Sequence, residues 1–320
     1  MDIFLSTQVL IFLLSETILY ALALFATIHT LTILRGWDFG ATTPRQYTLE
    51  KRAFLITTII QIILWLKIIL LPYFAYTIDS LAVLIPGAMC GAGVIAANVY
   101  GNPLLFLKIM LLFLIGIWLI VNRQDQKAID YPYFGTKFWF YLFIFVLLSL
   151  EYGLDLAYFS HISTSDVVQC CSAIFGISGS NTIPFNLTIT ALLAIFYLLY
   201  GLIMLLAYQR HALLLAPVSL LFLYIAYQSV VHFFGTYIYE LPTHKCPFCM
   251  LQREYYYVGY LLWASLFAGV FFAVANALLR LLIHKEIPKL YLYAMFFNTF
   301  FVILCTAYVL HYLFKNGVWL

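Results

Sequence analysis

The sequence predicts an all-α, polytopic membrane protein with about eight transmembrane helices. Hydrophobic residues make up 65% of the 320 residues and charged residues only 9%. Soluble domains carry about 25% charged residues, so this chain cannot cover a globule with a hydrated surface. Apolar runs of roughly 20 residues also recur along the chain, and each is long enough to cross a bilayer. The lipid bilayer is therefore the first predicted partner, and residues 1–320 are interpreted as a single transmembrane domain.

Polar breaks separate the apolar runs, as at Pro44-Arg45-Gln46 and Gly101-Asn102-Pro103. Proline and glycine are favoured where helices begin and end. The first run is interpreted as a retained span, because Asp2 stands where a signal peptide carries basic residues. The predicted spans lie near 8–34, 53–77, 103–122, 138–160, 188–208, 213–236, 255–283 and 291–314.

The distribution of lysine and arginine predicts the orientation, because cytoplasmic loops carry an excess of both. One set of loops holds Arg35, Arg45, Lys51, Arg52, Arg123, Lys127, Lys137, Arg210, Arg280, Lys285 and Lys289, and the opposite set holds Lys245, Arg253 and Lys315. The richer set is placed in the cytoplasm, so both termini are extracytoplasmic, in what we expect to be a prokaryotic inner membrane. The net charge of +3 is too small to indicate nucleic acid as a partner.

Most of the six cysteines fall at the predicted outer face. These are Cys90 between the second and third spans, Cys170 and Cys171 between the fourth and fifth, and Cys246 and Cys249 between the sixth and seventh. Cys305 falls inside the last span, where cysteine behaves as a small apolar residue.

Two outer segments share a pattern. Cys90-Gly91-Ala92 precedes Pro103, and Cys171-Ser172-Ala173 precedes Pro184 at the same spacing. Parallel repeats are common in membrane transporters. The pattern indicates repeated two-helix hairpins, and a chance match is the alternative.

Cys246-Pro247-Phe248-Cys249 is the sharpest motif in the chain. Pro247 fits the first turn of a helix, which predicts that the motif opens the seventh span. Two cysteines at this spacing can close a disulfide, and a helix N-terminus together with Arg253 would stabilise a thiolate. The motif therefore predicts a disulfide-exchanging site. A structural disulfide or half of a metal site would leave the same pattern.

The run from Cys246 and Cys249 to Gln252 and Arg253 resembles the active segment of DsbB-type membrane oxidoreductases, which pass electrons from thiols of a soluble partner to quinone. The resemblance implies a quinone contacted by the cysteine pair, with Gln252 and Arg253 beside it, and a periplasmic thioredoxin-like partner. It covers this segment alone. That family has four helices and a second cysteine pair in a later outer loop, whereas the only later cysteine here is Cys305.

His232 in the sixth span is a candidate neighbour of a quinone or haem. A single histidine in a span is otherwise explained by an ordinary hydrogen bond.

The vicinal pair Cys170-Cys171 resembles the vicinal-cysteine region of small mercuric-ion transport proteins. Adjacent cysteines are more often free thiols or soft-metal ligands than disulfides. With Cys90, Cys246 and Cys249 they would form either a thiolate cluster for a soft metal such as copper(I) or a relay of exchanging thiols. Burial as small residues is the third interpretation, for Cys90 and Cys170.

Charged residues also fall inside or near the ends of spans: Glu16, Lys67, Lys108, Glu151 and Asp155. Each costs about 3 kcal/mol or more at the bilayer centre unless it is paired. Glu151 and Asp155 share a helix face, Lys67 is placed to pair with Glu151, and Asp155 lies closer to the outer surface, where water would reach it. A proton path and a buried ion pair both fit this pattern.

The leading function predicted from the sequence is a membrane thiol–disulfide oxidoreductase linked to quinone. Cys249 would contact the quinone, and Cys246 would exchange with Cys90, Cys170 and Cys171. The first alternative is a transporter or sensor for a soft metal ion or thiol compound that uses the outer thiolates. The second is a non-catalytic subunit of a membrane complex with structural cysteines.

Overall fold

The computed structural model is 80% helical, and the described residues contain no strand. The structure describes residues 3–38, 40–41, 43–128, 131–169, 175, 183 and 186–320. Cys170, Cys171 and the second copy of the predicted repeat lie outside the described residues.

The described residues contain eight helices that are long and apolar enough to cross a membrane. They are α1 (Thr7–Gly36), α2 (Pro44–Leu81), α4 (Gly101–Asp125), α5 (Phe134–Ser160), α7 (Ile189–Tyr208), the run Ala212–Tyr239, α10 (Val258–Ile283) and α11 (Pro288–Asn316). These helices confirm the predicted fold class of an all-α polytopic membrane protein. The main difference in bounds is that α2 begins at Pro44 rather than near residue 53.

Short elements connect or interrupt the long helices. They are η1 (Ile3–Leu5), α3 (Gly91–Ile95), η4 (Cys249–Leu251) and η5 (Arg253–Tyr255). The sixth span is divided into α8 (Ala212–Ser229), the π-helical turn η3 (Val230–Phe234) and α9 (Gly235–Tyr239). π-helical turns inside α-helices are frequent at functional sites.

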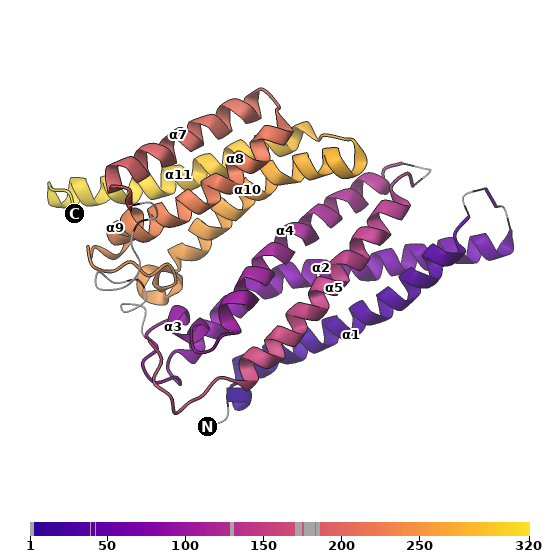
Figure 1. The fold of residues 1–320 in the computed structure, drawn as a ribbon, viewed down its shortest axis with the longest axis horizontal. Helices are drawn as coiled ribbons and strands as arrows, with labels where there is room; N and C mark the ends of the chain where they lie inside the picture. Colours follow the sequence, from indigo (N-terminus) through magenta and orange to yellow (C-terminus); the bar gives the residue numbers. More distant parts are fainter. Residues whose placement is uncertain are drawn as a thin grey trace. The chain divides into compact units, whose positions relative to one another are not determined.

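The chain divides into two compact units, of residues 1–77 with 98–164 and of residues 78–97 with 165–320. In the first unit α1, α2, α4 and α5 run side by side (Figure 1) around a core that includes Trp118, Phe138 and Tyr141. In the second unit α7, α8, α10 and α11 pack together (Figure 1). A cluster of aromatic rings from α7, α8, η3 and α11 packs together: Phe196, Phe222, Phe234 and Phe301.

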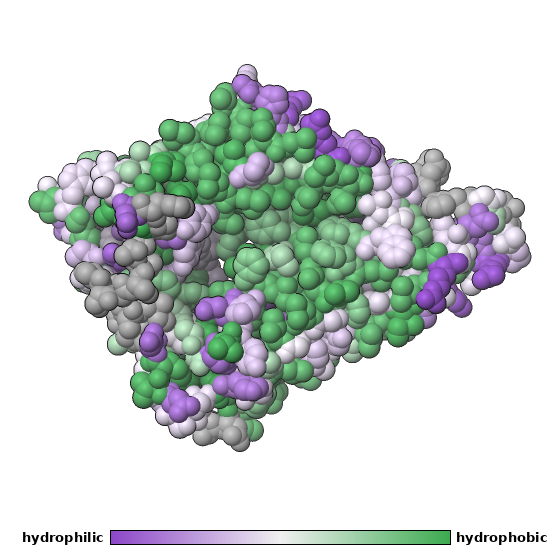
Figure 2. Space-filling view, in the orientation of Figure 1, coloured by the Kyte–Doolittle hydropathy of each residue, from purple (hydrophilic) through white to green (hydrophobic). Residues whose placement is uncertain are grey.

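Large apolar side chains are exposed along the outer flanks of the helices. Val146 on α5 is 64% exposed, Leu198 on α7 69% and Phe296 on α11 62%. Figure 2 shows apolar side chains along the lengths of the helices, with hydrophilic ones gathered near helix ends. Monomeric soluble proteins rarely expose apolar surface on this scale. The helix flanks are therefore surfaces for lipid, as expected of an integral membrane protein.

The connection between α4 and α5 is fixed by a buried ion pair. Asp125 Oδ2 lies 2.6 Å from Lys137 Nζ, and Asp125 Oδ1 accepts a hydrogen bond from the Tyr133 backbone N–H at 2.8 Å. Lys137, counted above among the loop cations, therefore lies within the first turn of α5 and is paired.

Candidate thiol centre and buried ion network

Three of the predicted site cysteines come together in the second unit. The sulphur atoms of Cys90, Cys246 and Cys249 all lie within 4.8 Å of one another. The Cys90 and Cys246 sulphurs are 3.4 Å apart. The three side chains are closed off from solvent, with Cys90 0%, Cys246 2% and Cys249 4% exposed. We call these three residues the thiol centre.

The thiol centre is built from turns rather than from a long helix. Cys90 has extended backbone and immediately precedes the short helix α3. Cys246 lies in the turn after α9, and Cys249 opens the 3-10 turn η4. The prediction that the Cys-Pro-Phe-Cys motif opens the seventh span is wrong, because α10 begins at Val258.

Local backbone conformation explains this difference. Gln252 is extended, with φ −82° and ψ 160°, and so ends η4. Tyr256 and Tyr257 have φ of 54° and 56°, in the left-handed region, which interrupts a right-handed helix. Pro247 therefore lies in a buried turn and not in the first turn of α10, which begins at Val258.

A tyrosine and a tryptophan from neighbouring helices hold the motif. The Tyr239 hydroxyl donates a hydrogen bond to the Cys246 carbonyl oxygen and accepts one from the Met250 N–H at 3.1 Å. Trp263 Nε1 donates to the Pro247 carbonyl oxygen at 3.3 Å. These bonds satisfy buried backbone groups that a non-helical turn would otherwise leave unpaired, and they fix the positions of both cysteines of the motif.

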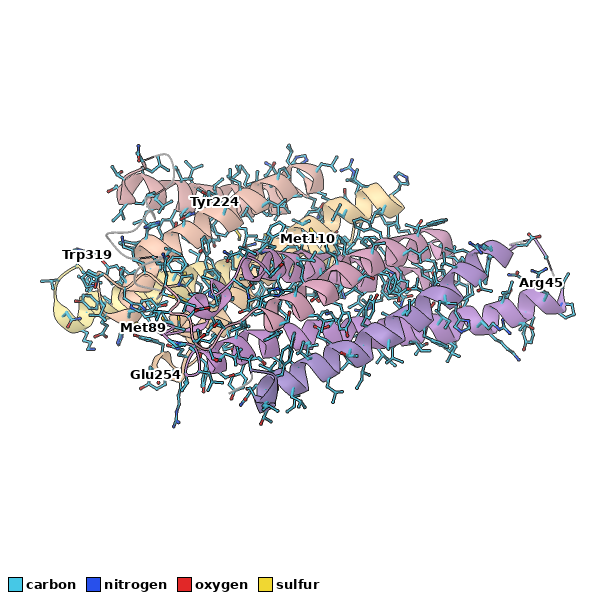
Figure 3. All side chains as sticks on the ribbon, turned by 60° about the horizontal axis from the view of Figure 1, so that its bottom comes forward. Arg45, Met89, Met110, Tyr224, Glu254 and Trp319 are labelled. Carbon is cyan, nitrogen blue, oxygen red and sulfur yellow. The ribbon has the colours of Figure 1, made fainter. Side chains whose placement is uncertain are left out.

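Asp79, near the end of α2, ties the Cys90 segment to the motif. Its Oδ1 atom accepts hydrogen bonds from the Gly91 N–H and from Gln252 Nε2, each at 3.1 Å. Gln252 Nε2 also lies 3.3 Å from the Met89 carbonyl oxygen. In Figure 3, Met89 and Glu254 mark the two chain segments that these bonds connect. Gln252 is therefore engaged in positioning the two segments.

Gly259 allows α10 to pack closely against the motif. A Cβ atom at this position would lie 2.6 Å from Met250 Cγ and 2.9 Å from the Met250 backbone carbon. Only glycine accommodates this approach without displacing the turn that carries Cys249.

The other predicted site residues are not part of the thiol centre. Arg253 is exposed, and among the described residues its side chain forms no hydrogen bond or ion pair. His232 is 4% exposed in the π-helical turn η3, and its Nε2 atom has no hydrogen-bond partner within the described part of the chain. Cys305 is fully buried within α11, apart from the three clustered sulphurs.

The intramembrane charges converge in the first unit. Lys67 Nζ lies 2.7 Å from a carboxylate oxygen of Glu16 and 2.7 Å from one of Glu151, which confirms the predicted Lys67–Glu151 pair. Lys108 Nζ lies 2.7 Å from Glu151 and 2.8 Å from Asp155. Asp155, expected to be hydrated, is instead 0% exposed, because α5 turns that face toward Lys108 on α4.

Sequence reasoning missed three residues that organise the thiol centre: Asp79, Tyr239 and Trp263. A signal existed for Asp79, because an isolated carboxylate close to the end of an apolar span requires partners. Tyr239 and Trp263 carried no such signal, since aromatic residues make up 19% of the chain.

Comparison with known protein families, with curated proteins and with solved structures gives no match to this chain.

Proposed function

We propose that this chain is an integral membrane protein that binds a soft metal ion of the copper(I) class through Cys90, Cys246 and Cys249. The observation that supports the proposal best is the convergence of three buried sulphurs within 4.8 Å. Thiolates are the preferred ligands of soft ions. Three sulphurs bound to one ion at about 2.3 Å lie about 4 Å from one another. Small movements of the three side chains would therefore complete a trigonal site.

The surroundings of the sulphurs favour metal binding over thiol–disulfide exchange with a soluble partner protein. A thiol that reacts with a soluble protein must be reachable, whereas each cysteine here is at most 4% exposed. Hydrogen bonds donated by Tyr239 and Trp263 and one accepted by Asp79 hold the ligand-bearing turns in place, as outer-sphere groups do at metal sites. Cys305 is equally buried but isolated in α11, which is the arrangement of a cysteine that only fills space.

The orientation predicted from the loop cations would place the thiol centre at the extracytoplasmic side. An even number of spans puts both termini on one side of the membrane, and eight are present among the described residues. We propose a prokaryotic inner membrane with both termini outside. The soft metal would then be cargo taken up, delivered or sensed from the outer side.

A copper(I) titration tests the proposal. The reduced protein is titrated anaerobically with copper(I) against a chromogenic chelator, with four single variants in parallel. Wild type and Cys305→Ser should bind one ion per chain, and Cys90→Ser, Cys246→Ser and Cys249→Ser should each lose tight binding. X-ray absorption should show sulphur neighbours at about 2.3 Å. Equal binding by Cys90→Ser and Cys305→Ser would exclude the site.

The 3.4 Å contact between the Cys90 and Cys246 sulphurs favours a second candidate, the quinone-linked thiol oxidoreductase. A disulfide bond is about 2.05 Å long, so little movement would join these atoms. In this scheme the two thiols lose two electrons and two protons to a quinone, which becomes a quinol. Cys249 then loses its proton and attacks the Cys246 sulphur, the Cys90–Cys246 bond breaks, and Cys90 leaves as a thiolate that takes up that proton. Arg253 remains the proposed contact for the quinone, and a thioredoxin-like protein the proposed partner.

Thiol counting separates the two candidates. The purified protein is alkylated before and after addition of a soluble quinone, and the labelled cysteines are identified by mass. Conversion of two centre cysteines to a disulfide, with formation of one quinol, supports the oxidoreductase. Unchanged thiols with bound metal support the metal site. Unchanged thiols without metal indicate that the cysteines are structural.

A further inference from the structure

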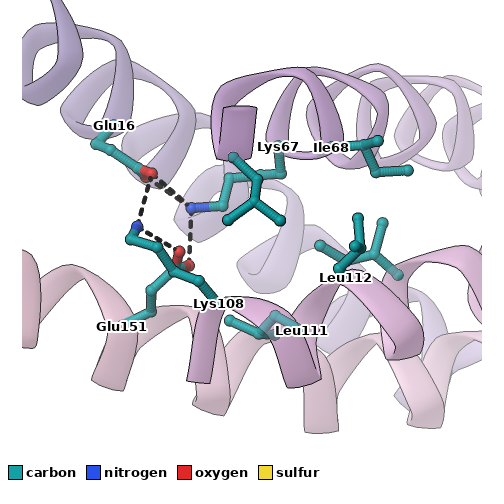
Figure 4. Close-up of a pocket in the computed structure, with 9 residues that line it drawn as sticks. Glu16, Lys67, Ile68, Lys108, Leu111, Leu112 and Glu151 are labelled. Carbon is teal, nitrogen blue, oxygen red and sulfur yellow. Dashed lines mark hydrogen bonds and ion pairs between the residues drawn. The ribbon is translucent and has the colours of Figure 1, made fainter. Parts of the chain in front are cut away.

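The buried charges of the first unit form one continuous network of five side chains. Figure 4 shows four of them, Glu16, Lys67, Lys108 and Glu151. Glu16 comes from α1, Lys67 from α2, Lys108 from α4, and Glu151 and Asp155 from α5. None of them is more than 9% exposed. Lys108 Nζ contacts all three carboxylates, at 3.4 Å from Glu16, 2.7 Å from Glu151 and 2.8 Å from Asp155.

The formal charges of the network do not cancel. Three carboxylates and two ammonium groups give −3 + 2 = −1 when all five are ionised. An uncompensated charge in a low-dielectric interior is strongly unfavourable, and such groups bind or lose a proton instead. One added proton makes the network neutral.

We propose that this network is a proton-binding site in which Asp155 takes up and releases one proton while both lysines stay charged. Both Glu16 oxygens and both Glu151 oxygens face a lysine ammonium within 3.4 Å. Asp155 Oδ2 accepts from Lys108, but Asp155 Oδ1 is buried with no hydrogen-bond partner among the described residues. Oδ1 is therefore the atom that carries the proton.

The groups around Asp155 support this assignment. The charged and titratable groups that face it are Glu16 on α1, Lys67 on α2, Lys108 on α4, and Glu151 and Tyr158 on α5. Two neighbouring carboxylates oppose ionisation of Asp155, and the two lysines are shared among all three acids.

Lys108 is held as a cation by its surroundings. Its ammonium lies over the rings of Phe12 and Phe74, 5.0 and 4.8 Å from their centroids, and cation–π attraction favours the charged form. This ammonium already occupies the point where the carboxylates converge. A metal ion would have to displace it, which makes the proton the fitting ligand.

Two small cavities border the network. One is lined by Glu16, Lys67, Lys108 and Glu151 together with apolar residues, and the other by Glu16, Lys67, Tyr20 and Tyr152. Each has a volume of about 10 Å³, close to the minimum for a single water molecule. A water in either cavity would have polar partners and could exchange a proton with the network.

Infrared pH-difference spectroscopy on the full-length protein in lipid nanodiscs tests the proposal without substitution. Exposed carboxyl groups are ionised well above pH 4–5, so a protonated-carboxyl band that persists at near-neutral pH reports a buried acid. Labelling with ¹³C-aspartate should shift this band, and labelling with ¹³C-glutamate should leave it in place, because Asp155 is the only aspartate in the network. A band that shifts with labelled glutamate would overturn the proposal. So would the absence of any protonated-carboxyl band at a pH above the range in which exposed carboxyl groups ionise.

Two variants supply an independent reading. Asp155→Asn should abolish the band, because the amide has no carboxyl group to protonate, and it should still fold, because the neutral amide imitates the protonated acid. Glu240→Gln is the control, since Glu240 lies at the surface in an exposed pair with Lys315, and it should keep the full band. Persistence of the band in Asp155→Asn would also overturn the assignment. The copper(I) titration is a separate measurement, so failure here leaves the thiol centre untouched.

Discussion

The sulphur atoms of Cys90 and Cys246 lie 3.4 Å apart although the residues are 156 positions apart in the sequence. Asp79 Oδ1 connects the two segments that carry these cysteines, because it accepts hydrogen bonds from the Gly91 N–H and from Gln252 Nε2. Cys249 completes the thiol centre within 4.8 Å of both. A segment between the second and third spans and another between the sixth and seventh are thereby combined into one site.

Mild oxidation should join Cys90 to Cys246. Treatment with diamide should give a peptide pair containing this disulfide in wild type and in Cys305→Ser, and the pair should be absent from Cys90→Ser. Bound copper(I) should slow the reaction, because ligated sulphurs are not free to react. The measurement is peptide mapping by mass spectrometry under non-reducing conditions. If Cys90 is still alkylated as a free thiol after complete oxidation, the contact between the Cys90 and Cys246 sulphurs is contradicted.

Tyr239→Phe should weaken copper(I) binding about 10- to 100-fold, the usual cost of losing an outer-sphere group at a metal site. The change removes a hydroxyl that bonds both the Cys246 carbonyl and the Met250 N–H. Tyr224→Phe serves as control, because Tyr224 is 45% exposed. The two affinities are compared by chelator competition. Equal affinity in both variants would show that the turn holds its shape without this hydroxyl.

Gly259→Ala should destabilise the second unit by about 1–3 kcal/mol, the usual cost of overpacking. The new Cβ atom would lie 2.6 Å from Met250 Cγ, so the turn carrying Cys249 must shift. Gly201→Ala in α7 is the matched control, because a Cβ there meets nothing within 4 Å. Thermal unfolding in detergent measures the stability of both variants relative to wild type. A destabilisation by Gly201→Ala as large as that by Gly259→Ala would contradict the close approach.

Lys108→Met should cost about 3–5 kcal/mol, because it leaves three buried carboxylates with one cation. Adding Asp155→Asn should restore part of the loss by removing one of those carboxylates. Lys315→Met should change stability by at most about 1 kcal/mol, since the Lys315–Glu240 pair is half exposed. Denaturant unfolding gives the free energy of unfolding of wild type, Lys108→Met, Lys108→Met with Asp155→Asn, and Lys315→Met. A Lys108→Met variant as stable as Lys315→Met would show that the network is hydrated.

The sequence could predict what depends on composition and local chain properties. Runs of apolar residues predicted the eight spans, because a bilayer core requires about 20 such residues for each helix. The placement of Lys67 and Glu151 within spans predicted their pairing, because an unpaired charge is costly there. The cysteines and their spacing predicted a site for disulfide exchange or for soft-metal binding, without deciding between the two.

Only the tertiary structure decided which residues meet. Pro247 suggested a helix start, yet the extended Gln252 and the left-handed Tyr256 and Tyr257 separate the motif from α10. Asp155 was expected in water, yet its face of α5 is turned toward Lys108 and is buried. Arg253 was expected beside the cysteines and is exposed. Local sequence sets the preferences of each segment, but contacts between distant segments depend on packing and on hydrogen bonds such as those of Asp79, which no local pattern encodes.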